Sequence, residues 1–229
     1  MKINLKKKPQ KPVIIEGFPG FGLVGTIATE FLIEHLKCEL IGEFEYNEFP
    51  AIVAIHKGNL VKPMAVHYSK KYNLVILQTI LNVKGKEWEI ADAIVDLSKQ
   101  LKAKEIVGIE GVASQSLSAD QKLFYYGNDR FKKTGLKPID ESIVVGVSGC
   151  LLLKTNNMSC IFAETNSALP DSKAASKVIG VLDKYLGLKV DPKPLLKQAE
   201  DFESKLKNII QQTSKTTTES DKKYMSYLG

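Results

Sequence analysis

Arginine is nearly absent from this sequence. Arg130 is the only arginine among the 32 basic residues, and the others are lysines spread along the chain. Proteins that read nucleic acids depend on arginine for two-pronged contacts to phosphate and guanine. The net charge is +6, but no nucleic-acid-binding motif accompanies it, and we expect no nucleic-acid partner.

Cysteine is also scarce. The chain has Cys38, Cys150 and Cys160, and no two of them have the Cys-x-x-Cys spacing. An odd number of cysteines without that spacing argues against both a disulfide framework and a zinc ribbon. We therefore expect three reduced thiols that pack among apolar residues, and no bound metal.

Long apolar runs are missing as well. No run reaches the ~18–20 residues that a membrane-spanning helix needs. The basic N-terminus, MKINLKKKPQK, is followed by no apolar signal-peptide core. We expect a cytoplasmic protein without a membrane partner. The 229 residues, 44% of them hydrophobic, suffice for one large α/β domain or for two small domains.

The common catalytic motifs do not occur either. The sequence has no G-x-S-x-G elbow, no H-E-x-x-H and no phosphate-binding P-loop. Ser148 lies between two glycines but has no assignable histidine–acid pair. The histidines are His35, His56 and His67. His56 and His67 flank a predicted hairpin, and no third metal ligand is visible beside them.

Alternating apolar segments predict an α/β fold. The fold class is a three-layer sandwich with a mixed, mostly parallel central sheet, followed by a C-terminal helix and a flexible tail. The turn Lys57-Gly58-Asn59 predicts a hairpin, and hence some antiparallel pairing. The predicted strands are 12–16, 40–46, 51–56, 60–68, 73–79, 105–109, 143–147 and 158–163, and the predicted helices are 22–37, 88–101, 170–186 and one beginning at Asp191-Pro192.

Three parts of the chain are expected to differ in organisation. Residues 1–11 form a basic N-terminal arm, residues 12–210 a single α/β domain, and residues 211–229 a polar tail that cannot bury a core. Apolar residues end this tail, which is typical either of a short docking peptide or of a frayed end without function. The candidate partner-binding residues are Tyr224, Met225, Tyr227, Leu228 and Gly229.

A glycine-rich stretch follows the first predicted strand. Gly20, Gly22 and Gly25 spell G-x-G-x-x-G, the pattern of a dinucleotide-binding turn. Glu43 and Glu45 lie at about the distance of the acid that binds ribose in such proteins.

Three neighbouring residues weaken the dinucleotide interpretation. Phe18, Pro19 and Phe21 stand where a phosphate cradle needs bare backbone, and Pro19 has no N–H to donate. The other interpretation is a tight strand-to-helix turn, with glycine wherever φ is positive or the chain passes closely. The local residues leave both open.

Carboxylates gather near the predicted ends of strands. Glu164 follows a buried strand, and Asp171 and Glu110 are expected near the same edge. Such a pair can perform acid–base chemistry. The alternative is structural, with Asp171 supporting the first turn of a helix and Glu164 capping backbone amides. We favour it because no nucleophile or metal-ligand set accompanies the acids.

The last predicted helix has an apolar stripe. Two heptads of such spacing suit packing either on the helix's own domain or between subunits. The stripe consists of Leu195, Ala199, Phe202, Leu206 and Ile209.

Four motifs occur in order along the chain: GFPGFGLVG, EGVAS, IVVGVSGCLL and AETNSALPDSKAASKVIGVLDKYLGLKVD. With them, residues 11–208 resemble the proteasome assembly chaperone 2 family in its archaeal form. The positions that carry the family motif are Gly17, Pro19, Gly20, Gly22, Gly25, Glu164, Thr165, Pro170 and Asp171.

The resemblance implies a chaperone or adaptor without a cofactor, and not an enzyme. It implies an α/β sandwich similar to phosphorylases and peptidases, a glycine turn without a nucleotide, homo-oligomers, and proteasome α-subunits as partners. Phe18, Phe21, Phe202 and Leu206 are the expected oligomer contacts. The alternative is a small-molecule or nucleotide-binding enzyme that uses the turn at residues 17–25 and the Glu164/Asp171 edge.

The tail fits the implied function incompletely. Proteasome activators end in a hydrophobic residue, a tyrosine and one final residue. Here Tyr227 is third from the end, so the pattern is displaced by one position. A flexible tether with an aromatic and apolar end still suits weak docking that several copies make together.

Overall fold

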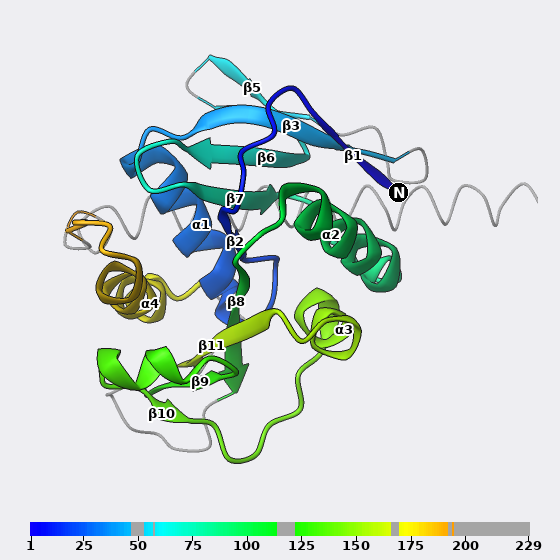
Figure 1. Cartoon of the computed structure of the whole chain (residues 1–229). Coiled ribbons are helices and arrows are strands. Elements are labelled where there is room, and N and C mark those ends of the chain that lie inside the picture. Colours follow the sequence, from blue (N-terminus) through cyan, green and yellow to red (C-terminus); the bar gives the residue numbers. More distant parts are fainter. Residues whose placement is uncertain (47–52, 57, 114–121, 166–169, 192–193, 195–229) are drawn as a thin grey trace, which may run out of the picture.

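The structure is a computed structural model, and it describes residues 1–46, 53–56, 58–113, 122–165, 170–191 and 194. Most of the described strands belong to one nine-stranded sheet, in the order β1-β3-β6-β7-β2-β8-β11-β9-β10. Helices cover both faces of this sheet (Figure 1). The strands are β1 (Lys2–Leu5), β2 (Val13–Glu16), β3 (Glu39–Glu45), β6 (Met64–Ser69), β7 (Leu74–Thr79), β8 (Glu105–Ala113), β9 (Leu123–Tyr126), β10 (Lys137–Pro138) and β11 (Met158–Thr165).

The centre of the sheet is parallel. Strands β7, β2, β8 and β11 run side by side in one direction, while β3, β6 and β9 pair antiparallel toward the margins. Apolar residues on both faces suit a strand that helices cover on both sides, and every residue of β7 is buried. The predicted three-layer sandwich around a mixed sheet is therefore confirmed.

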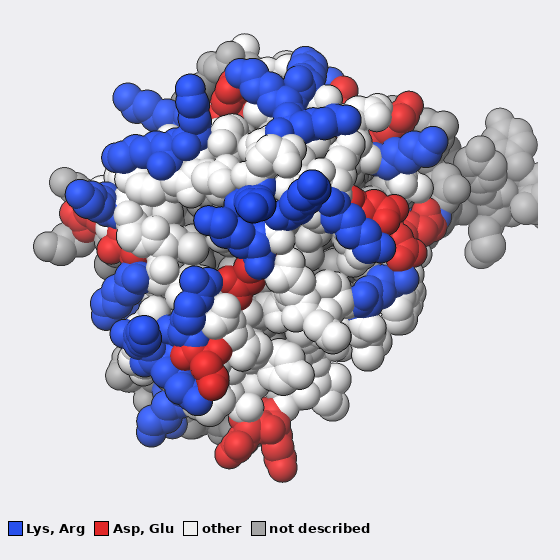
Figure 2. All heavy atoms as spheres, viewed as in Figure 1, with Lys and Arg blue, Asp and Glu red and all other residues white. Residues whose placement is uncertain are grey.

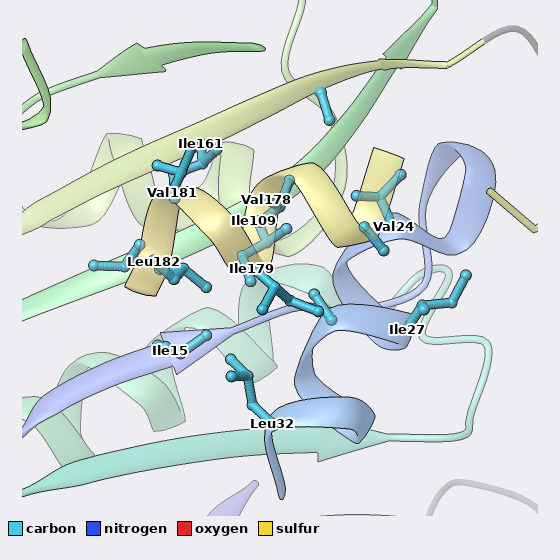
Figure 3. Packing of buried hydrophobic residues seen from close by; sticks show 14 of the residues in the cluster. Ile15, Val24, Ile27, Leu32, Ile109, Ile161, Val178, Ile179, Val181 and Leu182 are labelled. Carbon is cyan, nitrogen blue, oxygen red and sulfur yellow. The ribbon is translucent and has the colours of Figure 1, made fainter. Parts of the chain in front are cut away.

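Within the described part of the chain, two α-helices lie on each face of the sheet. Helices α1 (Val24–His35) and α4 (Ser172–Leu186) cover one face, and α2 (Glu87–Leu101) and α3 (Gly146–Lys154) cover the other (Figure 1). Figure 3 shows side chains of α1 and α4 meeting those of the central strands. The labelled core residues are Ile15, Val24, Ile27, Leu32, Ile109, Ile161, Val178, Ile179, Val181 and Leu182.

The N-terminal residues are part of the sheet. Strand β1 pairs antiparallel with β3, from Lys2 opposite Glu45 to Leu5 opposite Gly42. The predicted basic arm ahead of the domain is thus wrong for this segment. Alternate residues of β1 are partly buried, and Ile3 and Leu5 pack against the core below α2. The segment joins the sheet because these apolar residues lie between its lysines.

The predicted hairpin forms at residues 54–61. Strands β4 (Ala54–His56) and β5 (Asn59–Val61) pair with each other as a separate two-stranded sheet. His67 lies on β6 instead, where its Nε2 is 2.9 Å from Oε1 of Gln78. Burial lowers the pKa of His67, which favours the neutral imidazole of a sheet residue.

The segment 143–147 is not the predicted strand. Residues 143–145 are irregular, and α3 begins at Gly146, whose φ is +80°. Val144 and Val147 pack inward, three residues apart as on one face of a helix, while Ile143 and Val145 are exposed. The short apolar run therefore could not distinguish a strand from a helix start.

The only arginine of the chain supports the fold. Arg130 lies in the 3-10 helix η2 (Asp129–Thr134), and its guanidinium donates to Oε2 of Glu105 at 3.1 Å. Glu105 is buried at the start of β8 and also accepts from Tyr185 and Ser159 at 2.6 Å each. These bonds connect η2, α4 and β11 to one buried carboxylate. Without such partners, the burial of a charged carboxylate would be strongly unfavourable.

No helix among the described residues is both long and apolar enough to cross a membrane.

We expect Arg130→Met to lower the free energy of unfolding by about 1–2 kcal/mol, because Glu105 loses its cationic partner while water partly replaces the exposed guanidinium. Chemical denaturation measures this change. The control is Lys132→Met, since the ion pair of Lys132 with Asp129 on the same helix is exposed and its loss should leave the stability unchanged. Equal effects of the two substitutions would contradict the role of Arg130.

Candidate functional site

The glycine turn, residues 17–25, is a tight crossing of main chain over the sheet. A Cβ atom on Gly25 would lie 2.6 Å from the carbonyl oxygen of Ile109 on β8. Gly22 has a φ of +62°, in the left-handed region that favours glycine. A Cβ atom on Gly22 would lie 2.7 Å from Oγ1 of Thr165. These glycines are therefore needed for close packing and for positive φ.

Asp171 ties this turn to the neighbouring strand and helix. Its backbone N–H donates to the carbonyl oxygen of Gly22 at 2.8 Å. Its carboxylate accepts from Thr165 Oγ1 at 2.8 Å and caps α4 by accepting from Ala174 N at 2.9 Å. The family-motif residues from the two ends of the chain thus meet at the carboxyl edge of the sheet. The predicted support of the first turn of α4 by Asp171 is confirmed.

The geometry disagrees with a dinucleotide-binding turn. In such a turn the second glycine lets the backbone approach a pyrophosphate. Here Gly22 occupies that position and packs on Thr165, beside the carboxylate of Asp171, which repels a phosphate. Glu43 lies on β3, and β6 and β7 separate that strand from β2. The predicted ribose-binding acids Glu43 and Glu45 therefore do not adjoin the turn.

The predicted pair of Glu164 and Asp171 does not form. Successive residues of a strand point to opposite faces, and Thr165, which contacts Asp171, is the residue after Glu164 on β11. Oε2 of Glu164 instead accepts from the backbone N–H of Lys122 at 3.1 Å. This agrees with the structural alternative, in which Glu164 binds backbone amides.

The predicted oligomer contacts differ in their exposure. Phe18 is buried in the core beneath α2, so it is not available to another subunit. Phe21 is half-exposed on the turn. Phe202 and Leu206 lie outside the described residues, as do the five tail residues Tyr224, Met225, Tyr227, Leu228 and Gly229.

An acid pair lies under the turn, on the face covered by α2 and α3, with Glu16 fully buried and Glu110 partly buried. Glu16 is the last residue of β2 and is fully buried. Glu110 on β8 is its diagonal neighbour, because Glu16 pairs with Gly108 and Glu110 stands two residues further on. A Cβ atom on Gly20 would lie 3.0 Å from Oε2 of Glu110, so the turn rests on this carboxyl group.

Ser148 lies beside Glu16. It is the third residue of α3, and its hydroxyl donates to Oε1 of Glu16. Oε2 of Glu16 is buried and has no hydrogen-bond partner among the described residues. The N-terminal end of a helix favours negative charge, so α3 stabilises the ionised form of Glu16.

Burial governs the protonation of these groups. It raises the pKa of Glu16 to about 7, while hydrogen bonds from Ser148 and from the backbone of Phe18 act in the opposite direction. Burial and the neighbouring Glu16 also raise the pKa of Glu110. Cys160 lies on the same face across Gly108, and burial raises the pKa of its thiol well above the ordinary value. This thiol is therefore neutral, as predicted for a packed cysteine.

Sequence reasoning missed Glu16. The sequence alone places Glu110 near Glu164 and Asp171 and gives Ser148 no partner. The signal that could have found Glu16 is a charged residue at the end of an otherwise apolar central strand, directly before the glycine turn. Among the described residues, no cluster of three or more histidine, cysteine or acidic side chains is placed to hold a metal ion.

Known proteins resemble this chain over most of its length. The model of the PAC2 family matches residues 14–210, which include the glycine turn, the acid pair and Asp171. The chain belongs to the PAC2 family. An uncharacterised protein of Methanocaldococcus jannaschii, MJ0106, is 29% identical over 227 residues, covering 96% of this chain and 94% of that protein.

Two solved structures of archaeal PAC2 relatives are similar over most of their length. Pyrococcus furiosus PbaA, described as an archaeal homolog of proteasome-assembly chaperone, has a TM-score of 0.84 and 29% identity, covering 94% of this chain and 99% of PbaA. Pyrococcus furiosus PbaB, described as an archaeal proteasome activator, has a TM-score of 0.73 and 25% identity, covering 91% and 98%. The family and the α/β fold expected from the four motifs are both confirmed.

We expect Gly25→Ala to lower the free energy of unfolding by at least about 2 kcal/mol, because its Cβ would collide with the main chain of Ile109. Gly180→Ala is the control. Gly180 lies inside α4 with nothing within 4 Å of an added Cβ, so alanine should stabilise the helix by about 0.5–1 kcal/mol. Thermal or urea unfolding distinguishes the two, and a harmless Gly25→Ala would contradict the packing role of the turn.

The pH dependence of stability follows from Glu16. Its pKa is higher in the folded than in the unfolded chain, so the folded state binds the proton more tightly. Stability is therefore greatest below about pH 4.5 for this group, and it falls as the pH rises through about 7. Across this pH range the free energy of unfolding of the natural chain, measured by urea unfolding, should fall by on the order of 1–3 kcal/mol because of Glu16. The Glu16→Gln variant should not show this fall.

The matched control for Glu16→Gln is Glu164→Gln, which changes a carboxyl group on the same face that binds a backbone amide at the surface. It should retain the pH dependence of the natural chain. An identical pH dependence in the Glu16→Gln variant would show that Glu16 does not hold a proton in the folded state.

Proposed function

We propose that this protein is a proteasome assembly chaperone-like protein that binds α-subunits or the α-ring of the 20S proteasome as a homo-oligomer in the cytoplasm. The observation that carries the proposal is the match with PbaA over almost the whole of both chains. The similarity to PbaB supports the same partner. The protein acts in this account by binding and not by catalysis.

Exposed apolar side chains around α3 support a binding function. Ile143 and Val145 lead into this helix, Leu153 lies near its end, and all three are exposed. Trp88 on α2 is also exposed, and its ring centroid is 5.2 Å from Nζ of Lys154 in the last turn of α3. We call these four residues, Trp88, Ile143, Val145 and Leu153, the α3 surface.

Charge is distributed unevenly around the α3 surface. Figure 2 shows few charged side chains over the region of α3, at the lower right, whereas lysines gather over the opposite side of this view. Uncharged apolar surface of this kind is typical of contacts between proteins. The α3 surface is therefore a described part of the chain that suits contact with another protein chain.

The tail is the proposed docking element. Tyr227, Leu228 and Gly229 end a polar stretch that begins at residue 211. A flexible polar tether allows an apolar end to reach a partner, and several tails in one oligomer would bind more tightly than one. This element lies outside the described residues, so the proposal rests on the sequence.

The test combines the mass of the free protein with capture of purified proteasome α-subunits. We expect a mass that is a multiple of the single chain, and capture of α-subunits by the natural chain. Deletion of residues 213–229 should preserve folding and mass and abolish capture. Tyr227→Ala should weaken capture, whereas the neighbouring Ser226→Ala should not.

Each result decides a separate part of the proposal. A monomeric mass would contradict the homo-oligomer. Undiminished capture after deletion of the tail would contradict the docking element alone, because α-subunits would still bind elsewhere. Failure of the natural chain to capture any α-subunit would contradict the proposed partner.

A further inference from the structure

Lysines gather at the amino edge of the sheet, where the central parallel strands begin. Figure 2 shows lysine side chains over the middle of this view, where the loop from β1 to β2 and the end of α2 lie in Figure 1. Three separate segments of the chain supply six exposed lysines here, which we call the lysine edge: Lys8, Lys11, Lys70, Lys71, Lys102 and Lys104.

Hydrogen bonds hold these three segments side by side. The backbone N–H of Lys11 donates to the carbonyl oxygen of Leu101 at 2.8 Å. The backbone N–H of Lys104 donates to the carbonyl oxygen of Pro12 at 2.8 Å. Nδ2 of Asn73 donates to the carbonyl oxygen of Lys11 at 3.0 Å. The segments before β2, β7 and β8 are therefore fixed to one another, so little ordering of the backbone is needed when a partner binds.

Three of the lysines form a row across the sheet. Strands β7, β2 and β8 start level with one another in the pairing register. Lys71, Lys11 and Lys104 lie within three residues before these starts. Neighbouring strands are about 4.8 Å apart, so the row spans about 10 Å. Side chains on one face of an extended peptide repeat about every 6.8 Å. The row is thus long enough to contact two alternate side chains of an extended segment.

Acids of the described residues do not neutralise the lysine edge. Two acids begin strands at this edge, but Glu39 pairs with Lys7, and Glu105 is buried with Arg130. Within the part of the chain that the structure describes, no ion pair involves a lysine of the edge, whereas other lysines have one: Lys7, Lys62, Lys86, Lys99, Lys132 and Lys154. Like charges held together repel, and a partner that supplies negative charge relieves the repulsion.

Local structure accounts for little of this arrangement. The C-terminal end of a helix favours a cation, which explains Lys102 after α2. It does not explain the lysines before β2 and β7. Lys11 has a φ of +52°, in the left-handed region that favours glycine or asparagine, so the backbone does not select lysine there. The property that the six positions share is an exposed positive charge.

The residue type at this edge favours carboxylates over nucleic acid. All six cations are lysines, which bind as point charges, whereas two-pronged contacts to phosphate and guanine need arginine. We propose that the lysine edge is a docking surface for an extended acidic segment of a partner protein. This surface is distinct from the apolar α3 surface, and it does not depend on the proposed proteasome partner.

Binding of a fluorescein-labelled octaglutamate peptide to the natural chain, followed by fluorescence anisotropy, tests the proposal. We expect binding that weakens at least about tenfold between about 50 and 300 mM salt, because exposed ion pairs are screened. An octaglutamine peptide should not bind. The triple variant Lys11→Gln, Lys71→Gln and Lys104→Gln should bind octaglutamate about tenfold more weakly, because it loses the row of cations.

The matched control removes the same charge from exposed lysines that lie away from the amino edge, by Lys84→Gln, Lys122→Gln and Lys137→Gln. Thermal unfolding checks that both triple variants fold, and the control should bind octaglutamate as the natural chain does. Equal weakening in both variants would show that only the net charge matters, and it would overturn the proposal.

Two further results would overturn it with the natural chain alone. One is the absence of octaglutamate binding at low salt. The other is tighter binding of a single-stranded oligonucleotide of the same charge, or of vesicles of anionic phospholipid, than of octaglutamate. None of these results depends on the capture of α-subunits.

Discussion

The close contact between the glycine turn and the carboxyl ends of β8 and β11 is the constraint on which the rest of the site depends. Gly25 packs on the main chain of Ile109, and Gly22 packs on Thr165. These contacts fix where α1 begins, and they bring the N-terminal motif against Asp171 and α4. Larger residues at these glycines would separate the turn from the sheet.

The same contact explains why acids occur where a nucleotide would otherwise be expected. The turn fills the edge of the sheet with main chain, and Asp171 and Glu110 lie against its glycines. Negative charge beneath the turn disfavours a phosphate. The G-x-G-x-x-G pattern therefore marks close packing of the main chain in this protein.

Much of the fold could be predicted from the sequence, because apolar periodicity reports burial directly. The continuous apolar run of β7 and the helical spacing in α2 were confirmed with small changes at the ends. The start of α3 is wrongly predicted as a strand, because a short apolar run such as 143–147 suits a strand and a helix start equally. The sequence does not predict β9 or η2, since β9 pairs with the distant strand β11 and η2 contacts Glu105 and Tyr185.

The candidate site was harder to predict for the same reason. Asp171 was found because a helix cap is a local signal. Glu16, Glu110 and Ser148 lie far apart in the sequence and meet only because β2 and β8 are neighbours beneath α3. Without the strand order, Glu110 could not be assigned to Glu16 instead of Glu164.

The protonation of the acid pair is measured most directly by nuclear magnetic resonance of the natural chain with its glutamate carboxyl carbons labelled. Signals of Glu16 and Glu110 are identified by their loss in the two glutamine variants. We expect both groups to titrate at or above about pH 7. Titration of both groups near the ordinary glutamate value of about 4.3 would contradict it.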